Sequence, residues 1–225
     1  MKFDLKLHKY LLMMILFFSC ANHKGNNLSL SPLFSDGMVL QRDAVVPIWG
    51  TIHPKKKVEI QTSWGSHGIA KADNSGKWII EISTIDDFGP HTITVHSGYD
   101  TIMVNDVLLG EVWLAAGQSN MEMDFEYCCN TTDNSYEEIS SANFPNLRMF
   151  NVKKHLSYKP TYRLDGSWEK ALSSKISSFS AVGYFFAKRL HQELDTPIGI
   201  IHASWGGSRL ESWTSHDVLN ELSAY

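Results

Sequence analysis

The sequence predicts an α/β fold preceded by a small all-β sandwich. Strand-like runs separated by turn residues, about every 8–12 residues, fill residues 28–107, which is typical of a small antiparallel sandwich. From residue 108 to residue 225 the order is an apolar strand, a long helical pattern and a second apolar strand, as in a parallel α/β sheet. The chain of 225 residues is 43% hydrophobic, so it can bury one large core or two small ones.

Alternation and turn chemistry define the first part. Residues 58–62 alternate between apolar and polar side chains, as on a strand with one buried face. Asp36-Gly37 lies between two short apolar runs, 32–34 and 38–40, and predicts a hairpin there. We interpret residues 28–107 as a β-sandwich scaffold, with glycan binding by this part as the alternative.

Three elements define the second part. Residues 112–116 are an apolar strand, and Ile198–Ile201 is a short apolar run of the kind that a parallel sheet buries. Between them, apolar residues at spacings of three and four predict a helix with one apolar stripe: Phe179, Val182, Phe186, Leu190 and Leu194. The run 195–197, which contains a proline, ends that helix.

Residues 1–20 are predicted to be a lipoprotein-type signal peptide. Three lysines (Lys2, Lys6 and Lys9) precede the apolar stretch 11–18, which is too short to span a hydrocarbon core of ~30 Å. Cys20 follows a small residue at the expected cleavage point, and this resembles a bacterial lipoprotein signal whose cysteine becomes lipidated. We therefore expect an exported protein, anchored by lipid in the cell envelope or periplasm. Ordinary secretion is the alternative.

Charge and cysteine usage exclude several function classes. The formal net charge is −4, and no strong basic cluster points to nucleic acid. Cys128 and Cys129 are adjacent, which disfavours a disulfide between them, and no Cys/His spacing indicates zinc. A small neutral or mildly acidic substrate fits this composition best.

A serine at a strand end is the main candidate for chemistry. Ser119 follows Gly117 at the end of strand 112–116, and unrelated hydrolases place a nucleophile at such a corner. The second strand runs into Gly206-Gly207, so both loops leave the carboxyl ends of neighbouring parallel strands, where sites form. The N–H groups of Ser119 and Gly207 can together stabilise an oxyanion. Met121 stands where the α/β-hydrolase elbow has its second glycine, so that turn is not expected.

Four blocks of sequence resemble the sialate O-acetylesterase family, an SGNH/GDSL-like group of hydrolases. They are Phe34–Arg42 with Val46–Gly50, Gly110–Met121, Phe179–Ala187 and Ile198–Trp213, in that order. The resemblance implies a three-layer SGNH-like fold, here incomplete, and a serine esterase that removes O-acetyl groups from sialic acid or related glycans through an acyl-enzyme. It implies Ser119 as the nucleophile, Gly207 as an oxyanion donor, and Gln118, Asn120 and Gly206 as pocket residues. No metal or organic cofactor is implied.

The acid and base of that family are not found in this sequence. They form a D-x-x-H arrangement, and none of the ten histidines has an aspartate three residues before it. We therefore expect this chain to be the N-terminal portion of a longer enzyme. His202 and His216 are the nearest substitutes, and for His202 we favour a structural or substrate-contact role. The alternative to an esterase is a non-catalytic glycan-binding or structural lipoprotein derived from one.

Overall fold

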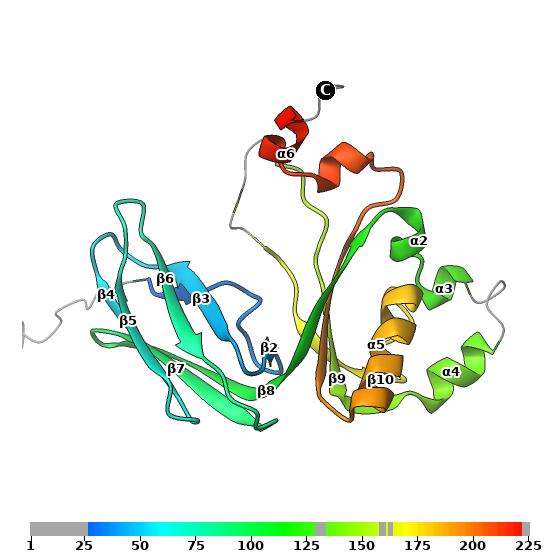
Figure 1. The fold of residues 1–225 in the computed structure, drawn as a ribbon, viewed down its shortest axis with the longest axis horizontal. Helices are drawn as coiled ribbons and strands as arrows, with labels where there is room; N and C mark the ends of the chain where they lie inside the picture. Colours follow the sequence, from blue (N-terminus) through cyan, green and yellow to red (C-terminus); the bar gives the residue numbers. More distant parts are fainter. Residues whose placement is uncertain (1–26, 129–133, 158–160, 162–163, 222–225) are drawn as a thin grey trace, which may run out of the picture.

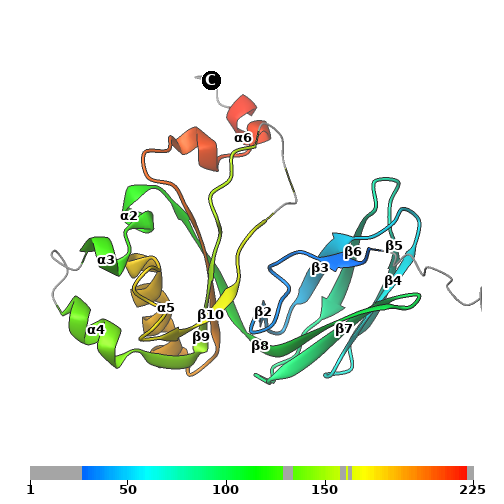
Figure 2. The same cartoon turned by 180° about the vertical axis from the view of Figure 1, so that it is seen from behind.

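The computed structural model describes residues 27–128, 134–157, 161 and 164–221, and these ranges form two lobes. One long strand, β8 (Asp100–Gly117), runs from the first lobe into the second (Figures 1 and 2). The predicted signal peptide with Cys20 lies outside the described residues. Within the described ranges, every helix is too short or too polar to cross a membrane.

The first lobe is built from strands. Its elements are β1 (Ser29–Leu30), β2 (Val39–Gln41), β3 (Val45–Thr51), β4 (Lys57–Thr62), β5 (His67–Lys71), β6 (Lys77–Ser83) and β7 (His91–Ser97). β1, β3 and β6 form a three-stranded antiparallel sheet. β5, β4, β7 and the first half of β8 form the antiparallel part of a larger sheet. The strand content expected for residues 28–107 is therefore present.

Alternation explains these strands. On β6, Trp78, Ile80 and Ile82 are buried, whereas the residues between them point outward. Inward residues of both sheets join one hydrophobic cluster, which includes Ile60 and Val95 on the larger sheet. Period-two patterning thus gives each sheet one buried face.

The predicted hairpin at Asp36-Gly37 is wrong. Gly37 has a φ of +82° and a turn does form, but the preceding residues are not a strand. β2 instead pairs in parallel with residues 108–110 of β8. The Asp-Gly pair predicts that the chain turns here, but it does not predict which strand pairs with the residues that follow.

The second lobe has a mixed sheet in the order β10-β9-β11-β8. β9 (Asn143–Asn151) and β8 both run parallel to β11 (Ile198–Ser204), and β10 (Trp168–Leu172) is antiparallel to β9. The helices and one 3₁₀ turn are α2 (Ser119–Glu122), α3 (Phe125–Cys128), α4 (Ser135–Ser141), α5 (Ala181–Leu194), η1 (Leu210–Trp213) and α6 (His216–Glu221). Helices α2 to α5 all lie on one side of this sheet (Figures 1 and 2). The expected α/β character is confirmed.

Helix α5 ends where the sequence predicts, and its start is capped by a serine. The N–H of Gly183 donates to Ser180 Oγ at 3.0 Å, which caps the first turn. Asp195 adopts the left-handed conformation that ends the helix, and β11 follows after Pro197.

Only part of the predicted apolar stripe faces the core: Phe179, just before α5, is buried, and Leu190 packs against the buried residues of the second lobe. Val182, Phe186 and Leu194 are about half exposed, and the buried positions are Ala181, Gly183, Tyr184 and Ala187. The helix packs its small residues against the sheet, where Gly183 lies next to Ala115. Part of the large apolar surface of α5 is therefore left open.

The two lobes share a core at their junction. Phe150 and Trp168 of the second lobe belong to the hydrophobic cluster of the first, and Trp168 Nε1 donates to the Leu33 carbonyl at 2.8 Å. Buried Arg148 binds both carboxylate oxygens of Asp106 at 2.9 and 3.0 Å. The expected boundary between residues 107 and 108 falls inside β8, so a division into separate domains there stays a prediction.

Candidate active site

Three parallel strands end at one edge of the second-lobe sheet. Gly117 of β8 is opposite Ser204 of β11, and Asn151 of β9 is opposite His202. Sites in open α/β sheets form at such carboxyl ends. Gly117 has a φ of +148°, a conformation that side chains rarely adopt, and the chain then turns into α2. Ser119, its first residue, is exposed.

The glycine loop after β11 passes directly beside Ser119. The N–H of Trp205 donates to the Gly117 carbonyl at 3.0 Å, which ties this loop to the end of β8. A Cβ built on Gly206 would lie 3.6 Å from Ser119 Oγ and 2.6 Å from a carboxylate oxygen of Glu122. A side chain at this position would therefore displace the Glu122 carboxylate. The structure therefore brings Ser119 and Gly206 together, as the sequence suggested.

Glu122 holds the glycine loop. Its carboxylate accepts the N–H of Gly206 and also contacts the Lys154 ammonium, which lies 5.6 Å from the ring centre of Trp205. The N–H of Gly206 is therefore already bonded. Gly207 is exposed, has a φ of +75° and has open space where a side chain would be.

The other predicted pocket residues flank the serine. Gln118 and Asn120 are exposed, and Gln118 Oε1 lies 3.5 Å from Ser119 Oγ, at the limit of a hydrogen bond. Gln118 can therefore touch a group bound at the hydroxyl. Its contact is too long to activate the hydroxyl, and an amide is not a base.

His202 lies close to this edge but is bonded elsewhere. Its Nδ1 lies 2.9 Å from Asn151 Oδ1, and its Nε2 lies 2.6 Å from Ser204 Oγ. Burial lowers the pKa of His202, although a hydrogen bond to the Met121 backbone opposes the shift. The imidazole is therefore neutral at pH 7 and is tied into the end of β11.

His216, the other candidate base, begins the short helix α6 and is exposed. Within the part of the chain that the structure describes, Ser119 Oγ has no hydrogen bond to an imidazole. The described residues also contain no group of three or more His, Cys, Asp or Glu side chains that could hold a metal ion.

Two clefts border the site. One of about 630 Å³ is lined by Glu122, His202 and Ser204 together with residues of β9, β10 and the segment before α5. Another of about 550 Å³ lies beside Trp205 and Trp213. Lys154 and Ser204 line both, and Ser119 lines neither. Both clefts therefore reach the end of β11 at Ser204, and neither includes the serine itself.

Sequence reasoning missed Glu122, Lys154 and Asn151. Asn151 and Lys154 had one usable signal, because they come at or just after the end of a strand parallel to β11. Glu122 had no clear signal, since its contacts to Gly206 and Lys154 join segments far apart in the sequence.

A family model described as carbohydrate esterase, sialic acid-specific acetylesterase, matches residues 109–224. The chain belongs to this esterase family. The match covers the second half of β8, Ser119 and the glycine loop, so the resemblance to sialate O-acetylesterases is confirmed by an independent comparison.

Individual proteins that are similar to this chain point to the same family. Human sialate O-acetylesterase is 29% identical over 85% of this chain and 39% of its own length. The mouse protein of that name is 32% identical over 81% of this chain and 36% of its own length. A crystal structure of a carbohydrate acetylesterase from Xanthomonas citri aligns with a TM-score of 0.78 and 37% identity, over 85% of this chain and 43% of that one. The chain thus spans about two fifths of the length of these curated relatives.

Proposed function

We propose that Ser119 is the nucleophile of an esterase that removes O-acetyl groups from sialic acid or related glycans. The observation that carries the proposal is the close approach of the Gly206-Gly207 loop to an exposed serine at the end of β8. Membership of the acetylesterase family supports the acetyl ester of a carbohydrate as the substrate. Family membership and the exposed serine at the strand end both support ester hydrolysis as the reaction class.

The reaction proceeds through an acyl-enzyme. Ser119 Oγ attacks the acetyl carbonyl carbon, and its proton passes to a base. The N–H groups of Ser119 and Gly207 stabilise the oxyanion, since Gly206 is bonded to Glu122. The C–O bond to the sugar then breaks, and the sugar leaves as an alcohol with the proton. Water hydrolyses the acetyl-serine to acetate and restores the hydroxyl. Gln118 and Asn120 orient the ester.

We infer that the base is supplied from outside residues 1–225. The geometry of His202 supports this, because both ring nitrogens already have partners other than Ser119. In this proposal a D-x-x-H segment completes the site and the three-layer SGNH-like fold. The reading frame beyond residue 225 tests it: we expect that segment to be encoded there. Unrelated sequence after a genuine stop would favour the non-catalytic glycan-binding lipoprotein instead.

Hydrolysis of p-nitrophenyl acetate by the 225-residue chain tests the missing base directly. We expect the wild-type rate to equal that of Ser119→Ala, because an unactivated serine is a poor nucleophile at pH 7. Ser208→Ala is the matched control for loss of a serine in the same region. A rate that depends on Ser119 would mean that a base is already present in this chain.

We also propose that the protein is exported and anchored by a lipid on Cys20. The basic and apolar pattern of residues 1–20 supports this. Expression in a bacterial host with radiolabelled palmitate tests it. We expect label in the wild type and none in Cys20→Ser, and an unlabelled membrane-free wild type would point to ordinary secretion.

A further inference from the structure

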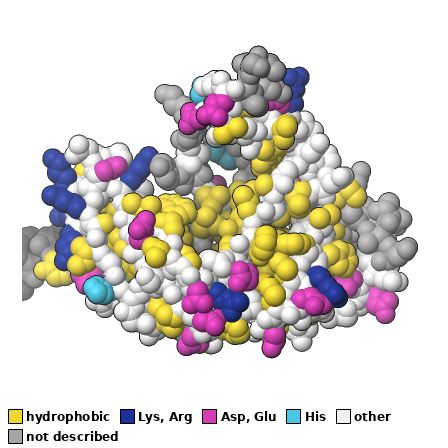
Figure 3. Space-filling view, in the orientation of Figure 1, with side chains coloured by type: hydrophobic (Ala, Val, Ile, Leu, Met, Phe, Trp, Pro, Cys, Tyr) yellow, Lys and Arg dark blue, Asp and Glu magenta, His cyan; other side chains and the backbone are white. Residues whose placement is uncertain are grey.

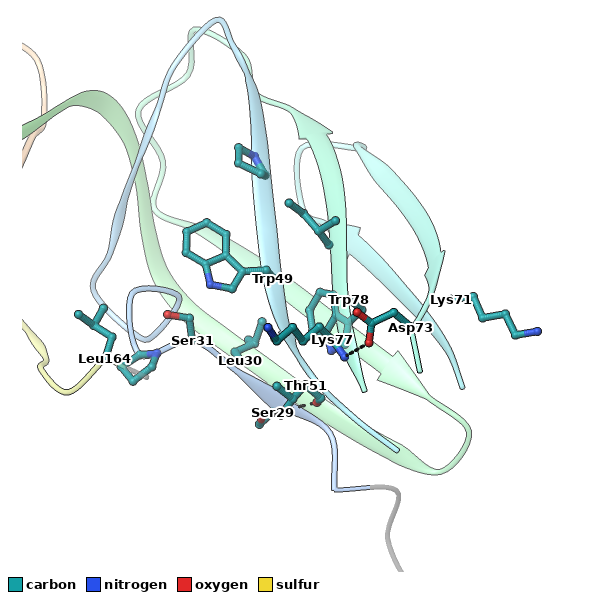
Figure 4. Close-up of a pocket in the computed structure, with 14 residues that line it drawn as sticks. Ser29, Leu30, Ser31, Trp49, Thr51, Lys71, Asp73, Lys77, Trp78 and Leu164 are labelled. Atoms are coloured by element: carbon teal, nitrogen blue, oxygen red, sulfur yellow. Dashed lines mark hydrogen bonds between the residues drawn. The ribbon is translucent and has the colours of Figure 1, made fainter. Parts of the chain in front are cut away.

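A third cleft lies on the first lobe, away from Ser119. It measures about 720 Å³ and is lined by the outer face of β1, β3 and β6 and by Leu164 of the second lobe (Figure 4). This volume is within the range of about 300–1,000 Å³ that small-molecule sites occupy. Figure 3 shows apolar side chains gathered around the hollow between the lobes.

The floor of this cleft is unusually apolar for an outward-facing sheet surface. Trp49 and Ile79 are neighbours in the register of β3 and β6, and Pro47 lies two residues before Trp49 on the same face. Ile79 is 60% exposed, and Val45, also on this face, is 62% exposed. Antiparallel sheets normally present polar residues to water, and exposed apolar patches of this kind mark binding surfaces.

Polar groups surround this apolar floor. The hydroxyls of Ser29 and Thr51 lie 2.7 Å apart on adjacent strands. Lys71 and Asp73 lie at one end of the cleft, and Trp49 lies with Leu164 at the other (Figure 4). The apolar floor thus has hydroxyl groups beside it, and the Lys71 ammonium and Asp73 carboxylate lie at the end away from Trp49.

Ser31 adds a polar group without a partner. Its Oγ is buried in the cleft wall and has no hydrogen-bond partner within the described residues. Its side chain points toward the Leu164 side of the cleft (Figure 4). A buried hydroxyl left unpaired costs about 1–3 kcal/mol. Rotation about χ1 can bring this hydroxyl to a bound polar molecule.

We propose that this cleft binds a neutral glycan chain, with one sugar ring stacked on Trp49. A pyranose has apolar C–H faces and a rim of hydroxyls, which match an indole and an apolar floor bordered by hydroxyls and charges. Two lysines, Lys71 and Lys77, and one aspartate, Asp73, line the cleft, so the choice of a neutral sugar rests on the apolar floor and a charged sugar is included in the test. The site holds the glycan at a distance from Ser119. The proposal rests on membership of a carbohydrate esterase family and not on the role of Ser119.

Calorimetric titration of the full chain with cellohexaose and xylohexaose tests the proposal, with 3′-sialyllactose as the charged comparison. We expect a neutral oligosaccharide to bind and Trp49→Ala to weaken binding about tenfold or more, the loss typical of a buried aromatic anchor. Trp205→Ala, beside Ser119, is the matched control and should bind normally. Trp49→Tyr, which keeps an aromatic ring, should recover part of the affinity, so a poorly folded alanine variant does not decide the result.

Three results would overturn the proposal. They are no binding of either neutral oligosaccharide, equal binding by Trp49→Ala, and loss of binding in Trp205→Ala alone. If neither neutral oligosaccharide bound, a polypeptide segment would be left as the occupant of the apolar floor. Equal binding by Trp49→Ala, or loss of binding in Trp205→Ala alone, would place the glycan at another site. Binding should be unchanged in Ser119→Ala, so failure of the esterase proposal leaves this test intact.

Discussion

At the scale of single residues, Glu122 joins three segments that arrive at the site from different strands. It follows the serine on α2, accepts the N–H of Gly206 in the loop after β11, and contacts Lys154 after β9. A hydrogen bond to a charged acceptor is worth about 1.5–3 kcal/mol. Glu122 is therefore a positioning residue for the glycine loop, whose Gly207 N–H we propose as an oxyanion donor.

Replacing Glu122 should loosen this loop. In Glu122→Ala we expect the amides of residues 205–208 to exchange with solvent about tenfold faster, because Gly206 loses its acceptor. Hydrogen-exchange mass spectrometry measures this. Glu126→Ala is the control, since the Glu126 carboxylate bonds Ser177 instead. Unchanged exchange in Glu122→Ala would show that other contacts hold the loop.

His202 should make the protein less stable in mild acid. Because burial lowers its pKa in the folded state, the unfolded chain takes up the proton first as the pH falls below about 6.5. The stabilisation that neutral His202 contributes is fully present above that pH. It is lost as the pH falls toward the pKa of His202 in the folded protein. Unfolding by urea from pH 7.5 downward should give a flatter pH dependence for His202→Gln. An equal slope for both proteins would contradict this.

At the scale of elements, the second half of β8 is an open edge. Residues 112–116 pair with β11 on one side, and no other described strand pairs with them. Trp113 and Leu114 are 45% and 67% exposed, and the Trp113 ring lies 5.2 Å from that of Phe186 on α5. An exposed apolar edge of this kind is a template for pairing with another chain.

The open edge should make the 225-residue chain self-associate. We expect sedimentation velocity to detect oligomers whose fraction rises with concentration, and Leu114→Lys to reduce them, because a charge at an edge disfavours pairing. Leu156→Lys makes the same change at a loop residue that is 79% exposed, and should have no effect. A monomeric wild type at about 100 µM would contradict the prediction.

Local patterns predicted these elements but not their partners. The strand at 112–116, the helix ending at 195 and the alternation of the first lobe all follow from neighbouring residues. The parallel pairing of β2 with β8 and the exposure of Phe186 depend on contacts between distant segments. Ser119 and Gly206 could be placed at one edge of the sheet, because each follows the end of a predicted strand. The contact of Glu122 with Lys154 could not be predicted, because it joins segments that are far apart in the sequence.

At the scale of the whole molecule, the lobes are joined by more than a strand. Arg148, whose side chain is 3% exposed, bonds Asp106 and the carbonyls of Gly37 and Pro145. The guanidinium holds the pKa of Asp106 below its usual range. Trp168 and Phe150 add apolar contact across the same junction. The two lobes are therefore expected to unfold together.

Removing the buried guanidinium should destabilise both lobes. We expect Arg148→Met to lower the free energy of unfolding by about 3 kcal/mol, because two carbonyls lose their donor and Asp106 keeps only Lys170 as a partner. Arg189→Met removes a surface ion pair on α5 and should cost less than about 0.5 kcal/mol. Circular dichroism and tryptophan fluorescence should report one coincident transition. Separate transitions for the two lobes would mean that the junction is weak.

Acetate release from a 9-O-acetylated sialic acid tests the central claim most directly, using the product of the complete reading frame that contains this chain. We predict that Ser119→Ala lowers kcat about a thousandfold or more with the fold intact, because it removes the hydroxyl that we propose forms the acyl-enzyme. Ser140→Ala, at an exposed position of α4, should retain most of the activity. A Ser119→Ala protein within about threefold of the wild type would contradict the assignment of Ser119 as the nucleophile.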